Sequence, residues 1–185
     1  MLQLNFHPFP ERRTEKLLLR RMKGTDAAEL FFLRSDPRVM QYIGREPAKS
    51  EEEVIEFIET INKNIDANET IMWAIALKEE PHRLIGNITL WQINKDHSRA
   101  ELGYLLHPDH WRKGIMREAI RAVIEYGFEV MKLHSIEAKV DSGNSGSALL
   151  LENVGFSKEG YFKEDFFFRG KYYDTMVYSL LNHNE

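Results

Sequence analysis

The sequence contains no cysteine among its 185 residues. This absence excludes a disulfide framework, a cysteine nucleophile, a thioredoxin-type redox motif and a zinc site built from thiolates. A chain without thiols fits a reducing compartment, so we expect the protein to be cytoplasmic.

The sequence also has no long apolar run and no excess of basic residues, and its first residues do not resemble a signal peptide. The apolar run Ile71–Leu77 is far shorter than the roughly 20 residues that a helix needs to cross a bilayer, so we expect no membrane partner. Residues 1–10 have neither a basic start nor a long apolar stretch, which argues against a signal peptide. The formal net charge of -4 is unlike the basic excess of nucleic-acid binders, so we expect no nucleic-acid partner.

The residues that are present have the composition of a folded globular domain, with 43% hydrophobic and 29% charged residues. A chain of this length commonly forms one domain, and no repeat or linker-like tract divides it. We therefore predict a single domain over residues 1–185 that begins with an arm, residues 1–13.

Hydrophobic periodicity predicts a mixture of strands and helices. Three central strands are joined by short polar connections, which indicates an antiparallel meander. The following strand, helix and strand predict one parallel pair, because such a crossover joins parallel strands. The expected helices cover about residues 25–35, 50–65, 115–131 and 145–153, and the expected strands cover 17–20, 71–77, 84–92, 99–106, 135–140, 156–162 and 172–180.

The most informative stretch is a strand, residues 101–106, followed by a basic turn that opens a long amphipathic helix. The first amides of a helix have no partner within the helix, and the helix dipole is positive at this end. Gly114 permits close approach, and Arg112, Lys113 and Arg117 add positive charge, so the turn predicts a phosphate site. On spacing alone, a solvated basic turn remains an equal interpretation.

This stretch resembles the phosphate-binding signature of the GNAT acetyltransferases, Gln/Arg-x-x-Gly-x-Gly/Ala. In the ribosomal-protein N-terminal acetyltransferase type, it often reads Tyr-Trp-Gly-Lys-Gly-Tyr-Ala-Thr-Glu-Ala, which matches here at Trp111, Lys113, Gly114, Glu118 and Ala119. Further matches occur in the family's order at residues 14–20, 100–104, 144–147, 152–156 and 159–160. The resemblance extends from residue 14 to about residue 181.

The resemblance implies a mixed, mostly antiparallel α/β (α+β) GNAT fold of about six to seven strands and about four helices. It also implies acetyl-CoA as co-substrate, bound at a splayed parallel pair of strands. The pantetheine arm would pair with the strand that ends at Leu105 and Leu106, as an added strand pairs with a free edge. We expect a bulge near Gly103 and Tyr104 that aims an amide at the thioester oxygen. The implied cofactor-binding residues are Leu105, Leu106, Arg112, Lys113, Gly114, Ile115, Met116, Arg117 and Asn144.

Two positions depart from the family pattern. Met116 stands where the family has Gly or Ala, and Arg112 replaces a common Gly. A bulky residue beside the pyrophosphate is compatible with binding if its side chain packs on the helix and leaves the amides toward the phosphates.

The reaction implied by the resemblance is direct acetyl transfer to an amine. Glu101 lies on the strand beside the expected acetyl group, and we take it as the base, acting through water. Its alternative role is that of a solvated or ion-paired strand residue. Ser147 is the candidate proton donor to the departing thiolate, and Asn144 the candidate for holding the pantetheine. Both are also ordinary residues for the start of a helix.

Other side chains carry weaker signals. His107 and His110 have no third ligand at a suitable spacing, so we expect no metal. Residues 166–168 and 172–173 are aromatic, and we favour the sheet core for them over a substrate site or dimer face. Trp73 and Trp91 share this ambiguity. The aromatic set from 161 to 178 is nevertheless denser than one small sheet face buries alone, so we expect a homodimer that uses this region.

These observations support three functions. The first is an acetyl-CoA-dependent N-acetyltransferase that acts on a protein or peptide N-terminus. The second keeps the chemistry but uses a small amine such as a polyamine, an aminoglycoside or an amino acid. The third is a catalytically silent acyl-CoA-binding module, to which Met116 lends weight. The acceptor is not encoded in the motifs, because substrate loops vary freely on one fold.

Overall fold

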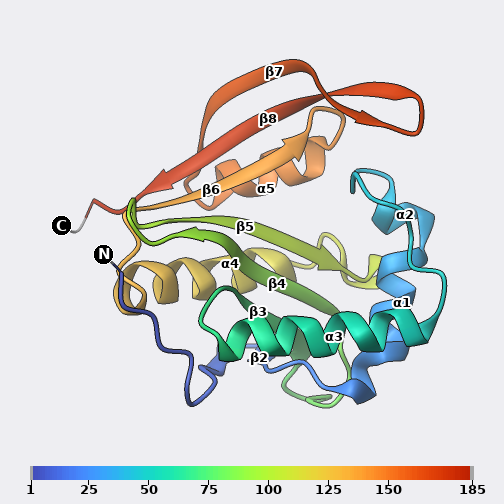
Figure 1. Cartoon of the computed structure of the whole chain (residues 1–185), viewed down its shortest axis with the longest axis vertical. Helices are drawn as coiled ribbons and strands as arrows, with labels where there is room; N and C mark the ends of the chain where they lie inside the picture. Colours follow the sequence, from blue (N-terminus) through green and yellow to red (C-terminus); the bar gives the residue numbers. More distant parts are fainter. Residues whose placement is uncertain (1, 184–185) are drawn as a thin grey trace.

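The computed structural model describes residues 2–183, which form a sheet in the order β1-β2-β3-β4-β5-β6-β8-β7 (Figure 1). Its neighbouring strands are antiparallel except for β5 and β6, which run parallel. The mixed, mostly antiparallel sheet is therefore confirmed. The described strands are β1 (Arg12–Arg13), β2 (Leu17–Arg20), β3 (Ile71–Leu77), β4 (Gly86–Asn94), β5 (Arg99–Leu106), β6 (Ser135–Asp141), β7 (Ser157–Phe168) and β8 (Lys171–Leu181).

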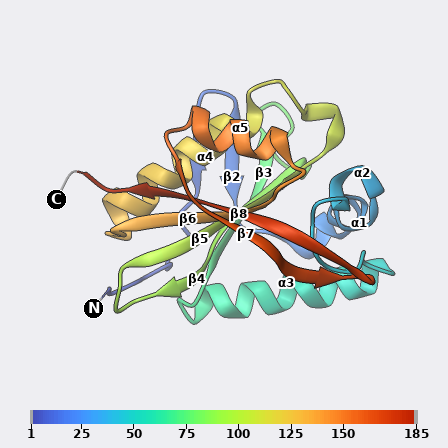
Figure 2. The same cartoon turned by 90° about the horizontal axis from the view of Figure 1, so that it is seen from above.

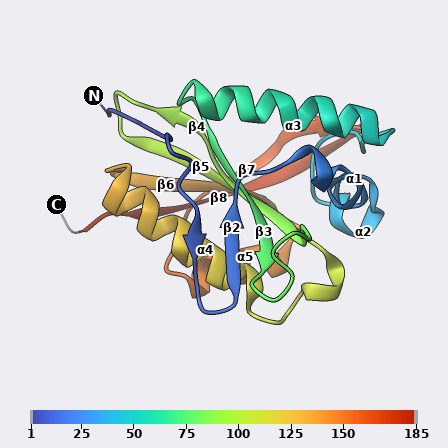
Figure 3. The same cartoon turned by 90° about the horizontal axis from the view of Figure 1, so that it is seen from below.

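Helices cover both faces of the sheet, with α4 and α5 on one face and α1 and α3 on the other (Figure 2 and Figure 3). Among residues 2–183, no helix is long and apolar enough to span a membrane. The helices are α1 (Ala27–Ser35), α2 (Pro37–Met40), α3 (Glu51–Asp66), α4 (Ile115–Glu125) and α5 (Ser145–Asn153), with short 3-10 turns η1 (Gly24–Asp26) and η2 (Pro108–His110) and a π-helical turn η3 (Tyr126–Val130) that continues α4.

In the described residues there is one strand more than the seven predicted from the sequence and one α-helix more than the four predicted. The additional elements, β1 and α2, are very short. Strand β1 has two residues, too few to leave a period in the sequence. Helix α2 is a single turn that begins at Pro37, and it is capped by Asp36, whose side chain accepts a hydrogen bond from the Arg38 amide. Asp36 and Pro37 end α1 as the sequence predicts, and they also start a new turn.

Strand β5 separates two hydrophobic clusters, because alternate residues of a strand point to opposite faces. Leu102 and Leu106 belong to the cluster that includes the buried stripe of α4. Leu105 belongs to the cluster that includes residues of α1 and α3. By the same alternation, Tyr104 faces α4 and Glu101 faces the side of α1 and α3.

The N-terminal arm packs against the body of the domain. Phe6 is fully buried, and the Trp73 indole Nε1 donates a hydrogen bond of 2.8 Å to the Pro10 carbonyl. At the end of the arm, the Lys16 amide donates to a carboxylate oxygen of Glu118 at 2.8 Å. Glu118, one of the residues that match the family signature, therefore ties the chain before β2 to the first turn of α4.

A buried ion pair holds the start of α1. Two guanidinium nitrogens of Arg20 lie 2.8 and 2.7 Å from the two carboxylate oxygens of Asp26, and both side chains are almost fully buried. Arg20 also donates to the carbonyls of Pro81 and His82 in the connection between β3 and β4. The pair therefore fastens the chain before α1 to the neighbouring strand connection.

The expectation that the aromatic residues of the last hairpin form sheet core is wrong. Strand β7 lies at the edge of the sheet beyond β8 and is exposed along most of its length (Figure 1). Phe167 is 59% exposed and Tyr172 is 57% exposed, although their rings lie 4.8 Å apart. Of the two ambiguous tryptophans, Trp73 is buried and Trp91 is exposed.

Candidate active site

The candidate site begins where β5 and β6 separate. Their pairing covers three residue pairs, from Arg99 with Ser135 to Glu101 with Glu137. Beyond these pairs β6 stays with β8 as far as Asp141, and β5 stays with β4 as far as Leu106. Figure 1 shows the two strands diverging. The edge of β5 that faces β6 is therefore free from Leu102 onward, and its amides and carbonyls can pair with a ligand.

The turn after β5 is closed by side-chain and backbone contacts. The Trp111 indole Nε1 donates to the Leu106 carbonyl at 2.8 Å, which folds the turn back onto the end of the strand. Arg112 and Gly114 both have positive φ angles, 59° and 77°. A Cβ atom at Gly114 would lie 3.7 Å from a guanidinium nitrogen of Arg117, which is an ordinary van der Waals distance. Glycine is required here by the backbone conformation rather than by crowding.

Helix α4 presents its first amides at the end of this turn. Glu118 donates its amide hydrogen to the Gly114 carbonyl at 3.0 Å, so the amides of Ile115, Met116 and Arg117 precede this intrahelical bond. Arg112 and Lys113 of the turn and Arg117 of the helix have exposed side chains, so this end of α4 combines free amides with positive charge, as the predicted phosphate site requires. The Met116 side chain is 6% exposed and packs in the core cluster, so it points away from the turn.

Glu101 is ion-paired. One of its carboxylate oxygens lies 3.1 Å from the Lys139 ammonium, and its side chain is 12% exposed. Lys139 also lies 3.5 Å from Glu137. Burial lowers the pKa of Lys139, but the hydrogen bonds and charges of Glu101 and Glu137 together outweigh burial, and the net pKa is raised. The ion-paired alternative is thus present in the structure, and the role of Glu101 as a base stays a prediction.

Asn144 and Ser147 open α5 on the opposite side of β5. The Asn144 side-chain oxygen accepts the Ser147 amide at 3.1 Å, which is the helix-capping role. The Ser147 hydroxyl lies 2.6 Å from the Tyr104 hydroxyl. Burial raises the pKa of Tyr104 to about 12. The sequence motifs do not mark this phenol as catalytic, although strand alternation places it on the face that α5 covers.

The expected bulge near Gly103 and Tyr104 is absent, which corrects the prediction of an amide aimed there by a bulge. Gly103 pairs with Thr89 and Tyr104 with Ile88 in an unbroken register. The irregularity lies between Trp91 and Asn94 of β4. Gln92 in that segment has a positive φ of 46°, so the distortion falls on the partner strand.

The loop after α2 and the tip of the β7–β8 hairpin meet beside the wide end of the opening (Figure 1). Arg169 forms an ion pair with Glu46. The Phe166 ring occupies the place that a side chain at Gly44 would need, since a Cβ atom there would lie 2.3 Å from Phe166 Cε1. These contacts join the loop after α2 to the tip of the β7–β8 hairpin.

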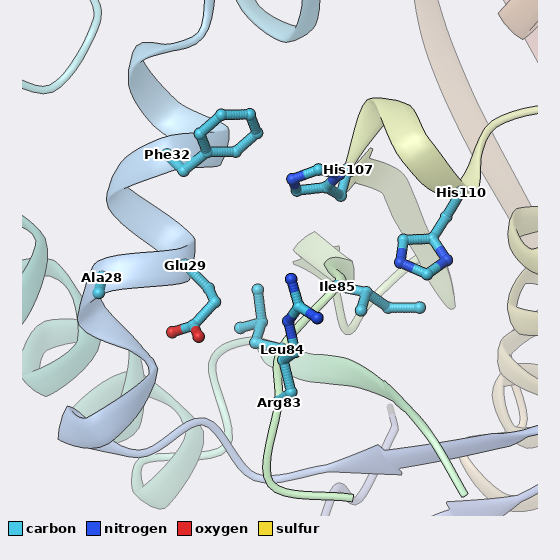
Figure 4. Close-up of a pocket in the computed structure, with 8 residues that line it drawn as sticks. All are labelled: Ala28, Glu29, Phe32, Arg83, Leu84, Ile85, His107 and His110. Carbon is cyan, nitrogen blue, oxygen red and sulfur yellow. The ribbon is translucent and has the colours of Figure 1, made fainter. Parts of the chain in front are cut away.

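A separate pocket of about 280 Å³ lies between α1, the segment before β4 and the turn after β5 (Figure 4). His107 stacks on Phe32 with ring centroids 4.5 Å apart, and burial lowers the pKa of His110. None of the predicted catalytic residues lines this pocket. Within residues 2–183, no group of three His, Asp or Glu side chains is arranged to hold a metal.

Comparison with known proteins gives a consistent result. Residues 16–157 match the acetyltransferase (GNAT) domain model. The chain is 36% identical over 177 residues to the uncharacterized N-acetyltransferase YoaA of Bacillus subtilis, covering 96% of this chain and 99% of that one.

Solved structures agree with the sequence relatives. The spermidine N-acetyltransferase of Vibrio cholerae, in complex with CoA and spermine, superimposes with a TM-score of 0.79 at 31% identity, covering 89% of this chain and 95% of that chain. The ribosomal-protein-S5-alanine acetyltransferase of Vibrio fischeri gives a TM-score of 0.84 at 24% identity, covering 95% and 98%. The second likeness concerns the fold alone.

Proposed function

The chain belongs to the GNAT acetyltransferases and has their mixed α/β fold, and from this premise we propose that it transfers acetyl from acetyl-CoA directly to a primary amine. The observation that carries the proposal is the free edge of β5 beside the N-terminus of α4. The edge suits an amide-containing arm and the helix end suits a pyrophosphate, and CoA has both groups.

The residues around the opening fit acetyl-CoA. Leu105 and Leu106 offer backbone groups on the free edge of β5 to the pantetheine arm. Arg112, Lys113 and the amides at the start of α4 would hold the pyrophosphate, and the burial of Met116 leaves those amides accessible. Met116 therefore no longer lends weight to the silent binding module. When bound, acetyl-CoA supplies the activated acyl group as a thioester.

The chain's own groups approach the opening from two faces. Glu101, on the side of α1 and α3, would take the proton that the amine loses, through a water molecule. Lys139 fixes the position of that carboxylate. Ser147, on the side of α5, would donate a hydrogen bond to the sulfur as the carbon–sulfur bond breaks. Asn144 holds the helix turn that carries Ser147.

We propose a protein or peptide N-terminal α-amine as the acceptor. An α-amine has an unperturbed pKa of about 7.7 to 8.0, against about 10.4 for a lysine side chain, so a larger fraction is neutral at pH 7. A polyamine is the second candidate, favoured by the 31% identity to the Vibrio cholerae spermidine N-acetyltransferase.

The test is release of the CoA thiol from acetyl-CoA with matched acceptors. A lysine-free peptide with a free N-terminus should support turnover, and the same peptide with a blocked N-terminus should not. Spermidine as a faster acceptor would replace the peptide assignment with the polyamine one. If no class of amine supports thiol release, acetyl transfer is refuted. The chain has no cysteine, so a thiol reagent gives little background.

We also propose a homodimer in the cytoplasm, formed through the β7–β8 hairpin by a second copy of the chain. Strand β7 has twelve residues and its outer edge has no strand beside it in the sheet. Phe162, Phe167 and Tyr172 are exposed on this hairpin. A two-fold contact between copies would cover both the free edge and these rings.

A further inference from the structure

Tyr104 and Ser147 join the two sides of the opening through their hydroxyl groups. Their oxygen atoms lie 2.6 Å apart, the distance of a strong hydrogen bond between hydroxyls. Tyr104 lies on β5, three residues beyond Glu101, the last residue paired with β6. Ser147 lies in the first turn of α5, which follows β6. The hydrogen bond therefore crosses the opening next to the free edge of β5.

Both partners are held in place. The Ser147 amide donates to the Asn144 side chain at 3.1 Å, which fixes the first turn of α5. The Tyr104 ring packs against the core cluster beside α4, and burial raises the pKa of this phenol to about 12. The phenol therefore keeps its hydrogen at neutral pH. When Tyr104 donates that hydrogen to Ser147, the serine hydroxyl hydrogen is free for a third atom.

We propose that Tyr104 is the positioning residue for Ser147. By donating its own hydrogen to the Ser147 oxygen, Tyr104 directs the serine hydroxyl hydrogen toward the sulfur of CoA. The inference rests on the proposed acetyl transfer. In that reaction the amine nitrogen forms a bond to the carbonyl carbon, and the carbon–sulfur electron pair goes to sulfur. Glu101 passes the nitrogen's proton to water, and the thiolate, hydrogen-bonded by Ser147, takes a proton from water. Tyr104 and Ser147 keep their own hydrogens throughout.

The arrangement predicts a property of the CoA complex itself. A hydrogen-bond donor favours the charged form of the group that it contacts, so the bound CoA thiol should have a lower pKa than free CoA. A second donor behind the first strengthens it, because hydrogen bonds in a chain polarise one another. The protein has no cysteine, so CoA carries the sole thiol of the complex.

The experiment is an ultraviolet titration of thiolate absorbance in the saturated CoA complex. The complex with desulfo-CoA, which lacks the sulfur, serves as the blank that cancels tyrosine ionisation. A hydrogen bond to a charged group corresponds to roughly 1 to 2 pKa units, so wild type should lower the thiol pKa by about one unit or more. Tyr104→Phe should lose a large part of this shift, and Ser147→Ala should lose nearly all of it.

Two further variants separate positioning from general packing. The double variant Tyr104→Phe with Ser147→Ala should match Ser147→Ala alone, because the phenol acts through the serine. Tyr126→Phe is the matched control, since Tyr126 is a buried phenol of the core cluster against which Tyr104 packs, and burial raises its pKa to about 12 as well. It should leave the thiol pKa unchanged. For acetyl transfer, Tyr104→Phe should lower kcat by roughly tenfold with little change in KM for acetyl-CoA.

Equal thiol pKa values in wild type and Tyr104→Phe would overturn the inference, as would an unshifted thiol in wild type. If wild type still transfers acetyl normally, either of these two results leaves the proposed function intact. If wild type binds CoA and lowers its thiol pKa but transfers no acetyl group, the proposed function fails and the hydrogen-bond chain stands. If wild type does not bind CoA, both are refuted.

Discussion

The phosphate site at the start of α4 can be tested by comparing two glycines. Gly114 in this site and Gly170 in the β7–β8 turn have φ angles of 77° and 79°. Neither position is crowded by neighbouring atoms. A valine should therefore cost each turn a similar backbone strain, about 1 to 2 kcal/mol. At about 2 to 4 °C per kcal/mol for this chain length, both variants should melt roughly 2 to 8 °C below wild type.

The two variants should differ when CoA is added. Ligand at 100 times its Kd adds about 2.7 kcal/mol to the free energy of unfolding, which corresponds to a rise in Tm of roughly 5 to 11 °C. Wild type and Gly170→Val should show this rise with CoA and with acetyl-CoA. Gly114→Val should lose most of it, because the side chain at the turn obstructs a phosphate and the strained turn misplaces the first amides.

The assay is thermal unfolding followed by circular dichroism, with acetyl-pantetheine as a third ligand. Acetyl-pantetheine lacks the pyrophosphate and should stabilise wild type only weakly at the same concentration. A full CoA shift in Gly114→Val, or equal stabilisation by acetyl-pantetheine and CoA, would refute the phosphate site. The turn would then be ordinary basic surface.

Three other changes test separate parts of the account. Glu101→Gln should lower kcat/KM at neutral pH by about 10²-fold with acetyl-CoA affinity nearly unchanged, and an unaltered rate and pH profile would remove Glu101 from the chemistry. Asp26→Ala leaves Arg20 buried without its partner and should reduce the free energy of unfolding in urea by about 3 to 5 kcal/mol, whereas a loss below about 1 kcal/mol would show that the pair is dispensable. Phe167→Lys should convert the proposed dimer to a monomer in light scattering at micromolar concentration, and a monomeric wild type would contradict the dimer.

The fold could be predicted from the sequence wherever apolar residues follow a clear period. Strands β3 and β5 and helix α5 have the predicted bounds. Helix α3 lies within one residue of its predicted bounds at each end, and the Ser50 side chain caps it by accepting the Glu53 amide. The prediction was weakest at β7, because periodicity cannot distinguish an aromatic edge strand from a buried one. Its exposure depends on β7 lying last in the sheet, which is a property of the topology.

Around the candidate site, the strand, the basic turn and the start of α4 could be predicted from the sequence, whereas the bulge predicted in β5 was wrong and the side-chain partners were not predicted. The basic turn and Gly114 could be identified because a helix end has a local sequence signature. The partners of Glu101 and Ser147 lie far away in the chain, Lys139 on β6 and Tyr104 on β5. Such pairs depend on strand register and on how far β5 and β6 diverge, and neither quantity has a local sequence signal.

Initial rates of CoA thiol release over a grid of acetyl-CoA and amine concentrations test the central claim most directly, with the amine that turns over fastest as acceptor. Direct acetyl transfer predicts rates that depend on both substrates and reciprocal plots that intersect, because both substrates must be bound before the acetyl group moves. Parallel plots would indicate a covalent acyl-enzyme, for which this chain has no cysteine. Thiol release that does not depend on the amine would contradict acetyl transfer at this site.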